Sequence, residues 1–206
     1  MSSSTVPAQV PTRTSGFRGP RIVTTAAVVF GAMCAASLGL YGFGEEGVRS
    51  AIRATARTTA AVFVVVFCMS AVRRRWPNPL TQWGTRNRRY LGLSAAVSHG
   101  YHLAFILSLY AMGVAGEISL LTLIGGGWGF ALLFAMAATS TDAAQKRLAK
   151  NWRRLHLLGI WTLWIIFGVS YFPGITTSAI AAIASLVLVA ALLLRVWPQA
   201  ALPSDA

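Results

Sequence analysis

The three histidines of this 206-residue chain, His99, His102 and His156, are the side chains best suited to bind a metal-containing cofactor. All three fall in or beside long apolar segments, where an ionisable side chain is costly and is a functional candidate by default. His99 and His102 stand three residues apart, so on a helix they share one face. A neutral imidazole is a common axial ligand of haem iron. Two facing helices that each present a histidine could therefore clamp a haem b edge-on, whereas an interhelical hydrogen bond is the alternative role.

Six apolar segments must position these histidines. A helix needs about 20 mostly apolar residues to cross a ~30 Å hydrocarbon core. Segments of this kind occupy residues 22–43, 55–72, 91–112, 118–138, 155–172 and 177–196. The third segment then carries His99 and His102, and His156 opens the fifth.

The connectors between these segments are short, so we expect one domain. The sequence predicts an all-α membrane protein, a six-transmembrane-helix bundle over residues 22–197. We expect a disordered cytoplasmic tail at residues 1–21, which are rich in Ser, Thr, Pro and Arg, and a flexible C-terminal tail at residues 198–206.

The composition favours a membrane protein and argues against a nucleic-acid-binding one. The chain is 55% hydrophobic and only 11% charged, whereas a soluble domain carries about 25% charged residues. Its net charge is +13, but the cations stand in short runs between apolar blocks instead of clustering on one solvated face. We expect a multi-pass protein of the cell membrane whose first partner is the lipid bilayer, with no nucleic acid bound.

The positions of Lys and Arg predict the orientation, because short basic loops stay in the cytoplasm. Of the 18 basic residues, all but Arg49, Arg53 and Arg57 precede the first span, lie in the second and fourth connectors, or, in the case of Arg195, end the last span. Both termini are therefore expected on the cytoplasmic side.

The depths of the histidines leave two pairings open. His102 lies thirteen residues beyond Arg89, roughly 20 Å along its helix. His156 lies roughly 14 Å along its own helix if that helix begins near Arg147, and the two imidazoles could then meet across one porphyrin. If the helix begins later, His99 is the alternative partner of His156.

Three motifs carry a resemblance to a known family. The first combines Thr139-Ser140-Thr141, Lys146-Arg147-Leu148, Trp152 and Leu155-His156. The second is Arg88-Arg89-Tyr90-Leu91-Gly92-Leu93 followed by His102, and the weakest is Thr55-Ala56-Arg57-Thr58. Together they resemble the second to fifth helices of the ferric-reductase-like transmembrane family, in its MsrQ (YedZ) branch of haem-bearing membrane subunits. The resemblance covers roughly residues 55 to 170.

The resemblance implies an electron-transfer subunit of an oxidoreductase system, with no catalytic residues of its own. His102 and His156 match haem-ligand positions, whereas His99 matches none. The family's further histidine, thirteen residues past the position of His156, is Val169 here, so we expect a single haem b. Arg57 is expected near a haem propionate or a lipid headgroup.

The expected partners also follow from the resemblance. It implies a periplasmic oxidoreductase as the electron acceptor. We expect no flavin or nicotinamide domain after the sixth span, so the donor is expected to be a cytoplasmic flavoprotein, a membrane quinol, or a flavin bound at the cytoplasmic loops. The alternative function is a non-catalytic membrane scaffold or transporter-like protein that has lost haem. Transport is disfavoured because the spans contain no Asp or Glu, which ion pathways usually need.

Overall fold

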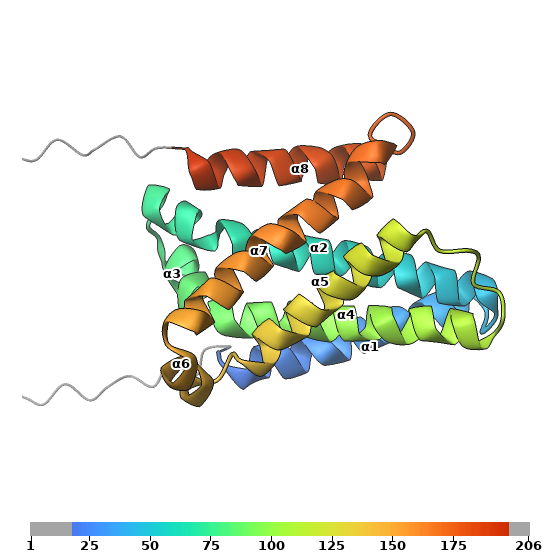
Figure 1. The fold of residues 1–206 in the computed structure, drawn as a ribbon, viewed down its shortest axis with the longest axis horizontal. Helices are drawn as coiled ribbons and strands as arrows, with labels where there is room; N and C mark the ends of the chain where they lie inside the picture. Colours follow the sequence, from blue (N-terminus) through green and yellow to red (C-terminus); the bar gives the residue numbers. More distant parts are fainter. Residues whose placement is uncertain (1–17, 198–206) are drawn as a thin grey trace, which may run out of the picture.

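The computed structural model describes residues 18–197, and every regular element in this part of the chain is helical (Figure 1). The elements are α1 (Pro20–Tyr41), α2 (Glu45–Arg75), α3 (Pro79–Arg86), α4 (Arg88–Ala111), α5 (Leu120–Ala138), α6 (Asp142–Leu148), α7 (Lys150–Tyr171), the 3-10 helix η1 (Phe172–Gly174) and α8 (Ala179–Val196). The all-α prediction is confirmed for this part of the chain. The predicted tails lie outside the described residues, except that residues 20 and 21 already belong to α1.

Several helices are long and apolar enough to cross a membrane. Within the described part these are α1, α2, α7 with η1, and α8. A fifth candidate joins residues 122–138 of α5 to α6 across a bend of 105°. The 24-residue α4 is long enough as well, but His99, Tyr101 and His102 interrupt its apolar sequence. The chain is thus a multi-pass membrane protein with four or five such helices.

Helix α2 is much longer than the predicted span at residues 55–72. It begins at Glu45 and ends at Arg75, 31 residues and roughly 46 Å in all. The prediction followed apolarity alone, whereas Ala and Arg are strong helix formers and extend the helix beyond the apolar block. Acidic residues in the first turn and arginines in the last also suit the helix dipole. Arg49 and Arg53 therefore lie on a helix and not in a loop, as Arg57 was already predicted to do.

The two basic connectors contain short helices that the sequence analysis missed. Helix α3 begins with a capping box, in which Asn78 Oδ1 accepts from the Thr81 amide and Thr81 Oγ1 accepts from the Asn78 amide. Helix α6 is capped by Thr141, whose hydroxyl accepts from the Ala144 amide at 3.1 Å. Both caps are local and polar, so a search for apolar segments does not detect them.

Helix α7 begins at Lys150, five residues before the predicted start. His156 therefore lies roughly 9 Å along α7, whereas His99 and His102 lie roughly 16 and 21 Å along α4. This later start, compared with one near Arg147, leaves His99 as the histidine of α4 closer in depth to His156.

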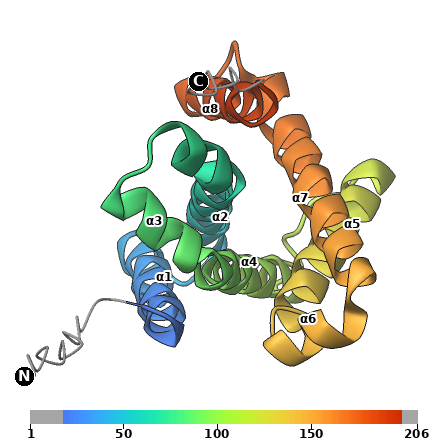
Figure 2. The ribbon, with the colours of Figure 1, turned by 90° about the vertical axis from the view of Figure 1, so that its left-hand side faces the viewer.

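The helices form two groups that share a core. Helices α1, α2 and α4 pack against one another, and α5, α7 and α8 complete the bundle (Figure 2). Phe63 and Phe67 of α2 meet Leu163 and Phe167 of α7 and Leu188 of α8 in the shared apolar core. The start of α1, the short helices α3 and α6, and the end of α8 all lie at one end of the bundle.

Candidate cofactor site

The motif around Thr139 and Trp152 builds the turn that positions His156. The Trp152 indole donates to the Thr139 carbonyl at 2.9 Å, which joins the start of α7 to the end of α5. Ser140 Oγ donates to the Met136 carbonyl at 2.6 Å. Between α6 and α7 the chain reverses at Ala149, whose φ of 45° is unusual for a residue with a side chain. The most specific motif of the sequence is thus the framework that carries His156.

The His156 imidazole is held in one orientation by Trp152. Its Nδ1 lies 3.0 Å from the Trp152 carbonyl, and the two rings stack with centroids 4.1 Å apart. A ring that donates from Nδ1 to a carbonyl keeps its lone pair on Nε2, which is the nitrogen then able to bind a metal. The Met136 carbonyl, which accepts from Ser140 Oγ, is a second backbone acceptor beside this ring.

A cavity of about 360 Å³ adjoins His156, within the range of small-molecule sites. Figure 2 looks along the bundle and shows α2, α4, α5, α7 and α8 following one another around this region. Phe63, Leu133, Met136, Ile160 and Leu163 supply much of its apolar wall. The cavity thus combines an apolar interior with one imidazole.

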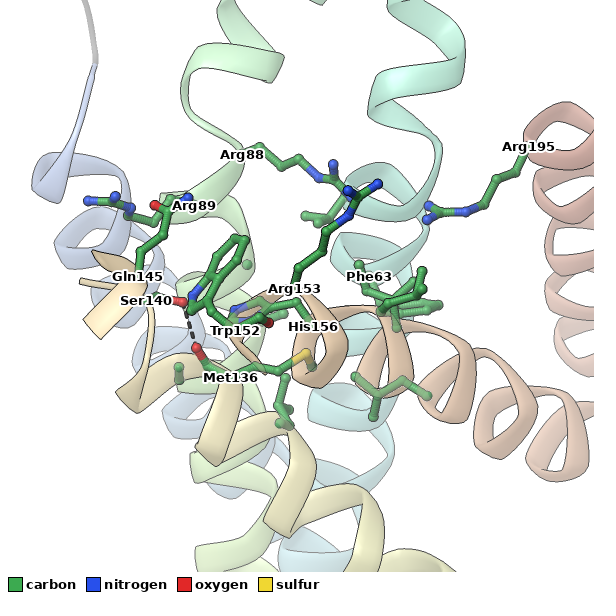
Figure 3. Close-up of a pocket in the computed structure, with 18 residues that line it drawn as sticks. Phe63, Arg88, Arg89, Met136, Ser140, Gln145, Trp152, Arg153, His156 and Arg195 are labelled. Atoms are coloured by element: carbon green, nitrogen blue, oxygen red, sulfur yellow. Dashed lines mark hydrogen bonds between the residues drawn. The ribbon is translucent and has the colours of Figure 1, made fainter. Parts of the chain in front are cut away.

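Arginines line the same cavity, and none of its lining residues is acidic. Figure 3 shows the guanidinium ends of Arg88, Arg153 and Arg195, from three different helices, directed toward one another. Arg88 Nη1 donates to Ser70 Oγ at 3.0 Å, and Arg195 Nη1 donates to the Phe67 carbonyl at 2.7 Å. Arginine forks match carboxylates and phosphates, so this convergence suits an anionic group on an otherwise apolar ligand.

A fourth arginine at the cavity, Arg89, is paired with Asp142 of α6. The hydrogen bond from Arg89 holds the pKa of the exposed Asp142 carboxyl below its usual range. This ion pair joins the start of α4 to α6 at the cavity mouth.

The His102 imidazole contacts polar atoms of α2. Its Nδ1 lies 3.0 Å from the Ile52 carbonyl and 3.1 Å from Thr55 Oγ1. One turn away, Thr59 Oγ1 donates to Ser98 Oγ at 2.9 Å, and both side chains are buried. We call this contact between α2 and α4 the hydroxyl seam; it comprises Ile52, Thr55, Thr59, Ser98 and His102.

His99 lies nearer to α5 than His102 does. It stacks on Phe130 of α5 with ring centroids 4.3 Å apart, and on His102 at 5.0 Å. Gly92 and Ala95, seven and four residues earlier on α4, line the cavity, so His99 continues their face one turn further along. In the described part of the chain its buried Nδ1 has no hydrogen-bond partner.

The site residues named from the sequence therefore fall in three places. His156 lines the cavity, His99 adjoins it, and His102 belongs to the hydroxyl seam. Arg57 lines a separate cavity between α2, α7 and α8. Val169 is 62% exposed on α7 and lines neither cavity, so a histidine there would point away from the interior. The pairing of His156 with either histidine of α4 stays a prediction.

The residues at the cavity fit a haem b better than a bare metal ion. No cluster of three or more His, Cys, Asp or Glu side chains that could hold an ion occurs in residues 18–197. A haem needs only one or two protein ligands, an apolar enclosure and cations for its propionates. The anchored imidazole, the apolar wall and the converging arginines provide this donor set, and the unpartnered nitrogen of His99 marks a second imidazole beside it.

The arginines are the part of the site that the sequence analysis did not identify. Arg153 and Arg195 were used there only to orient the helices and Arg88 also as part of a motif, and nothing in their spacing distinguishes these three from the other basic residues. No protein-family model, no curated protein and no solved structure matches the chain. The assignment of a function therefore depends on the site itself.

Proposed function

We propose that this protein is a membrane electron-transfer subunit that carries one haem b in the cavity between α4 and α7, with His156 as an axial ligand. The observation that carries the proposal is the His156 imidazole, held at Nδ1 by the Trp152 carbonyl beside an apolar cavity with an arginine rim. A histidine that served only to pack helices would need no such cavity.

The second axial ligand is proposed to be His99, the alternative partner that the sequence left open. Two facts favour it over His102. It lies closer in depth to His156, and its buried Nδ1 has no hydrogen-bond partner within residues 18–197, whereas Nδ1 of His102 lies 3.0 Å from the Ile52 carbonyl. Two imidazoles and no third available histidine fit a single six-coordinate haem per chain.

Each part of the site has a separate role in this proposal. Haem, when bound, supplies one-electron redox chemistry. Trp152 orients His156, and Ser140 hydrogen-bonds to the Met136 carbonyl beside the same ring. Arg88, Arg153 and Arg195 would bind the propionates, and Phe63 and Leu163 exclude water from the macrocycle.

The proposed topology has six spans with both termini in the cytoplasm, α4 being the third span and α5 the fourth. The described ends of α1 and α8 lie at the same end of the bundle as the basic helices α3 and α6, which supports this orientation. The cavity with His156 would then open toward the cytoplasm, where a flavoprotein, a bound flavin or a membrane quinol could donate electrons. The acceptor is proposed to be an oxidoreductase on the opposite side, as in the ferric-reductase-like family that the motifs resemble.

An absorption spectrum of the detergent-purified full chain, before and after dithionite, tests the proposal. We expect a reduced b-type spectrum and about one haem per chain by pyridine haemochrome assay. His156→Ala should remove most of this absorbance while the protein elutes at the same position in size-exclusion chromatography. Haem-replete membranes that yield protein without haem, or a folded His156→Ala variant with full haem content, would contradict the assignment. The first of these results would favour a scaffold.

A further inference from the structure

The first half of α2 carries two arginines that have no hydrogen-bond or salt-bridge partner in residues 18–197. Arg49, nearest its start, bonds Glu45 Oε1 at 2.6 Å and the Val114 carbonyl at 3.1 Å. Arg53 and Arg57 are exposed and make no hydrogen bond or salt bridge to any residue of the 18–197 segment. They stand four residues apart on one face of the helix, where like charges repel. An anion bound between them would relieve that repulsion.

An apolar groove continues from these arginines along the same face of α2. It is the cavity of about 300 Å³ between α2, α7 and α8 that Arg57 lines. Small side chains leave the space: Ala60 and Ala61 of α2 and Ala184 of α8. Ile180, Ile183 and Val187 of α8 flank it and are 45%, 62% and 43% exposed, so the groove is open to the lipid.

The groove begins where a membrane boundary is expected. Tyr171, which lines it, is the last residue of α7, and Ile180 is the second of α8, so the chain turns back at this level. Side chains on a helix lean toward its N-terminus, and arginine can extend its charged head to the headgroup region while its stem stays in lipid. Both guanidinium groups of α2 can therefore reach the level of lipid phosphates.

We propose that this groove binds one anionic phospholipid from the adjacent leaflet. Its phosphate lies between Arg53 and Arg57, with the Tyr171 hydroxyl beside them, and one acyl chain lies along Ala61 and Ala184. The two unpaired charges next to an apolar, lipid-facing groove match the two chemically different parts of a phospholipid. If an uncharged apolar helix of another protein filled the groove instead, the two arginines would have no anion to pair with. The proposal does not depend on haem.

Native mass spectrometry of the full chain, titrated with phosphatidylglycerol or phosphatidylcholine, tests the site. We expect wild-type protein to retain one phosphatidylglycerol per chain in preference to phosphatidylcholine. Because each cation near an anionic lipid contributes about a five-fold gain in binding, Arg53→Gln with Arg57→Gln should weaken retention by about twenty-five-fold. The matched control is Arg73→Gln with Arg74→Gln, an exposed pair at the other end of the same helix, which should retain the lipid.

A second variant tests the groove independently of charge. Ala61→Leu with Ala184→Leu fills the groove and leaves both arginines, so phosphatidylglycerol binding should fall while haem content stays unchanged. Equal retention of both lipids by wild-type protein, or full retention by the double Gln variant, would overturn the proposal. So would displacement of the lipid by inorganic phosphate, which would indicate a free-anion site, or recovery of a quinone from the groove in place of lipid.

Discussion

Two regions that meet on α4 place their histidines in different surroundings. At the hydroxyl seam, His102 contacts a carbonyl and a hydroxyl of α2, and the Thr59 hydroxyl donates a hydrogen bond to the Ser98 hydroxyl. At the cavity, His156 has an anchored Nδ1, and neighbouring His99 has a buried Nδ1 with no partner in the described part of the chain. The first region joins two helices, whereas the second contains an imidazole nitrogen without a partner in the described residues.

The difference lies in the imidazole nitrogens: Nδ1 of His102 and Nδ1 of His156 each lie 3.0 Å from a backbone carbonyl, whereas the buried Nδ1 of His99 has no hydrogen-bond partner within residues 18–197. Buried polar groups are nearly always paired, so an unpaired one requires an explanation such as a missing ligand. His99 and His102 stand three residues apart and carry the same side chain. Their contacts differ: His99 packs closer to Phe130 of α5, whereas Nδ1 of His102 also reaches Ile52 and Thr55 of α2.

The largest effect that would sharpen this comparison is expected at His99. If His99 is the second axial ligand, His99→Leu should weaken haem binding by at least about tenfold and leave an open coordination position. Carbon monoxide should then bind the reduced variant and shift its spectrum, whereas the wild-type spectrum should not respond. A wild-type response equal to that of His99→Leu would remove His99 from the site.

A smaller and different effect is expected at the hydroxyl seam. His102→Leu removes the contacts to Ile52 and Thr55, and interhelical hydrogen bonds in membrane proteins contribute about 0.6 to 1.7 kcal/mol. The free energy of unfolding in detergent should fall by that amount, with a lower melting temperature and an unchanged haem spectrum. His99→Leu serves as the matched control, because it replaces the same side chain one turn away. Loss of haem from a folded His102→Leu protein would instead support the pairing that the family resemblance implies.

The smallest effect is expected at the ion pair of Arg89 and Asp142, which lies at the cavity mouth, away from the hydroxyl seam. Because the folded state lowers the pKa of Asp142, the pair stabilises the protein above the unfolded pKa, near 4, and this contribution disappears as the pH falls through the folded pKa. Asp142→Asn should lower the melting temperature only slightly at pH 7 and not at all in strong acid. Identical melting curves for Asp142→Asn and wild type at both pH values would show that the pair has no effect.

The fold was largely predictable from apolarity, and the errors in the predicted helix boundaries have a common cause. Segments of about 20 apolar residues located every long helix, because burying the backbone in lipid leaves few alternatives to a helix. The same criterion misplaced the start of α2 by ten residues and missed α3 and α6, because helix propensity and side-chain caps determine those boundaries.

The candidate site was predictable only in part. His156 and its supporting motif could be named because Thr139 and Trp152 are close in sequence and interact locally. The arginine rim could not, since Arg88, Arg153 and Arg195 come from three helices and converge only after the bundle packs. Arg57 was expected near either a propionate or a headgroup, and the cavity it lines lies apart from His156.

The sequence by itself determined that the chain is helical and membrane-embedded, because hydrophobicity and helix periodicity are local properties. It also predicted candidate cofactor ligands. Only the tertiary structure decided their surroundings: the Ile52 carbonyl and the Thr55 hydroxyl of α2 contact His102, the Trp152 carbonyl contacts His156, and the buried Nδ1 of His99 has no hydrogen-bond partner within residues 18–197. Whether a polar group is satisfied depends on neighbours that are distant in sequence, and that dependence appears only when the helices pack.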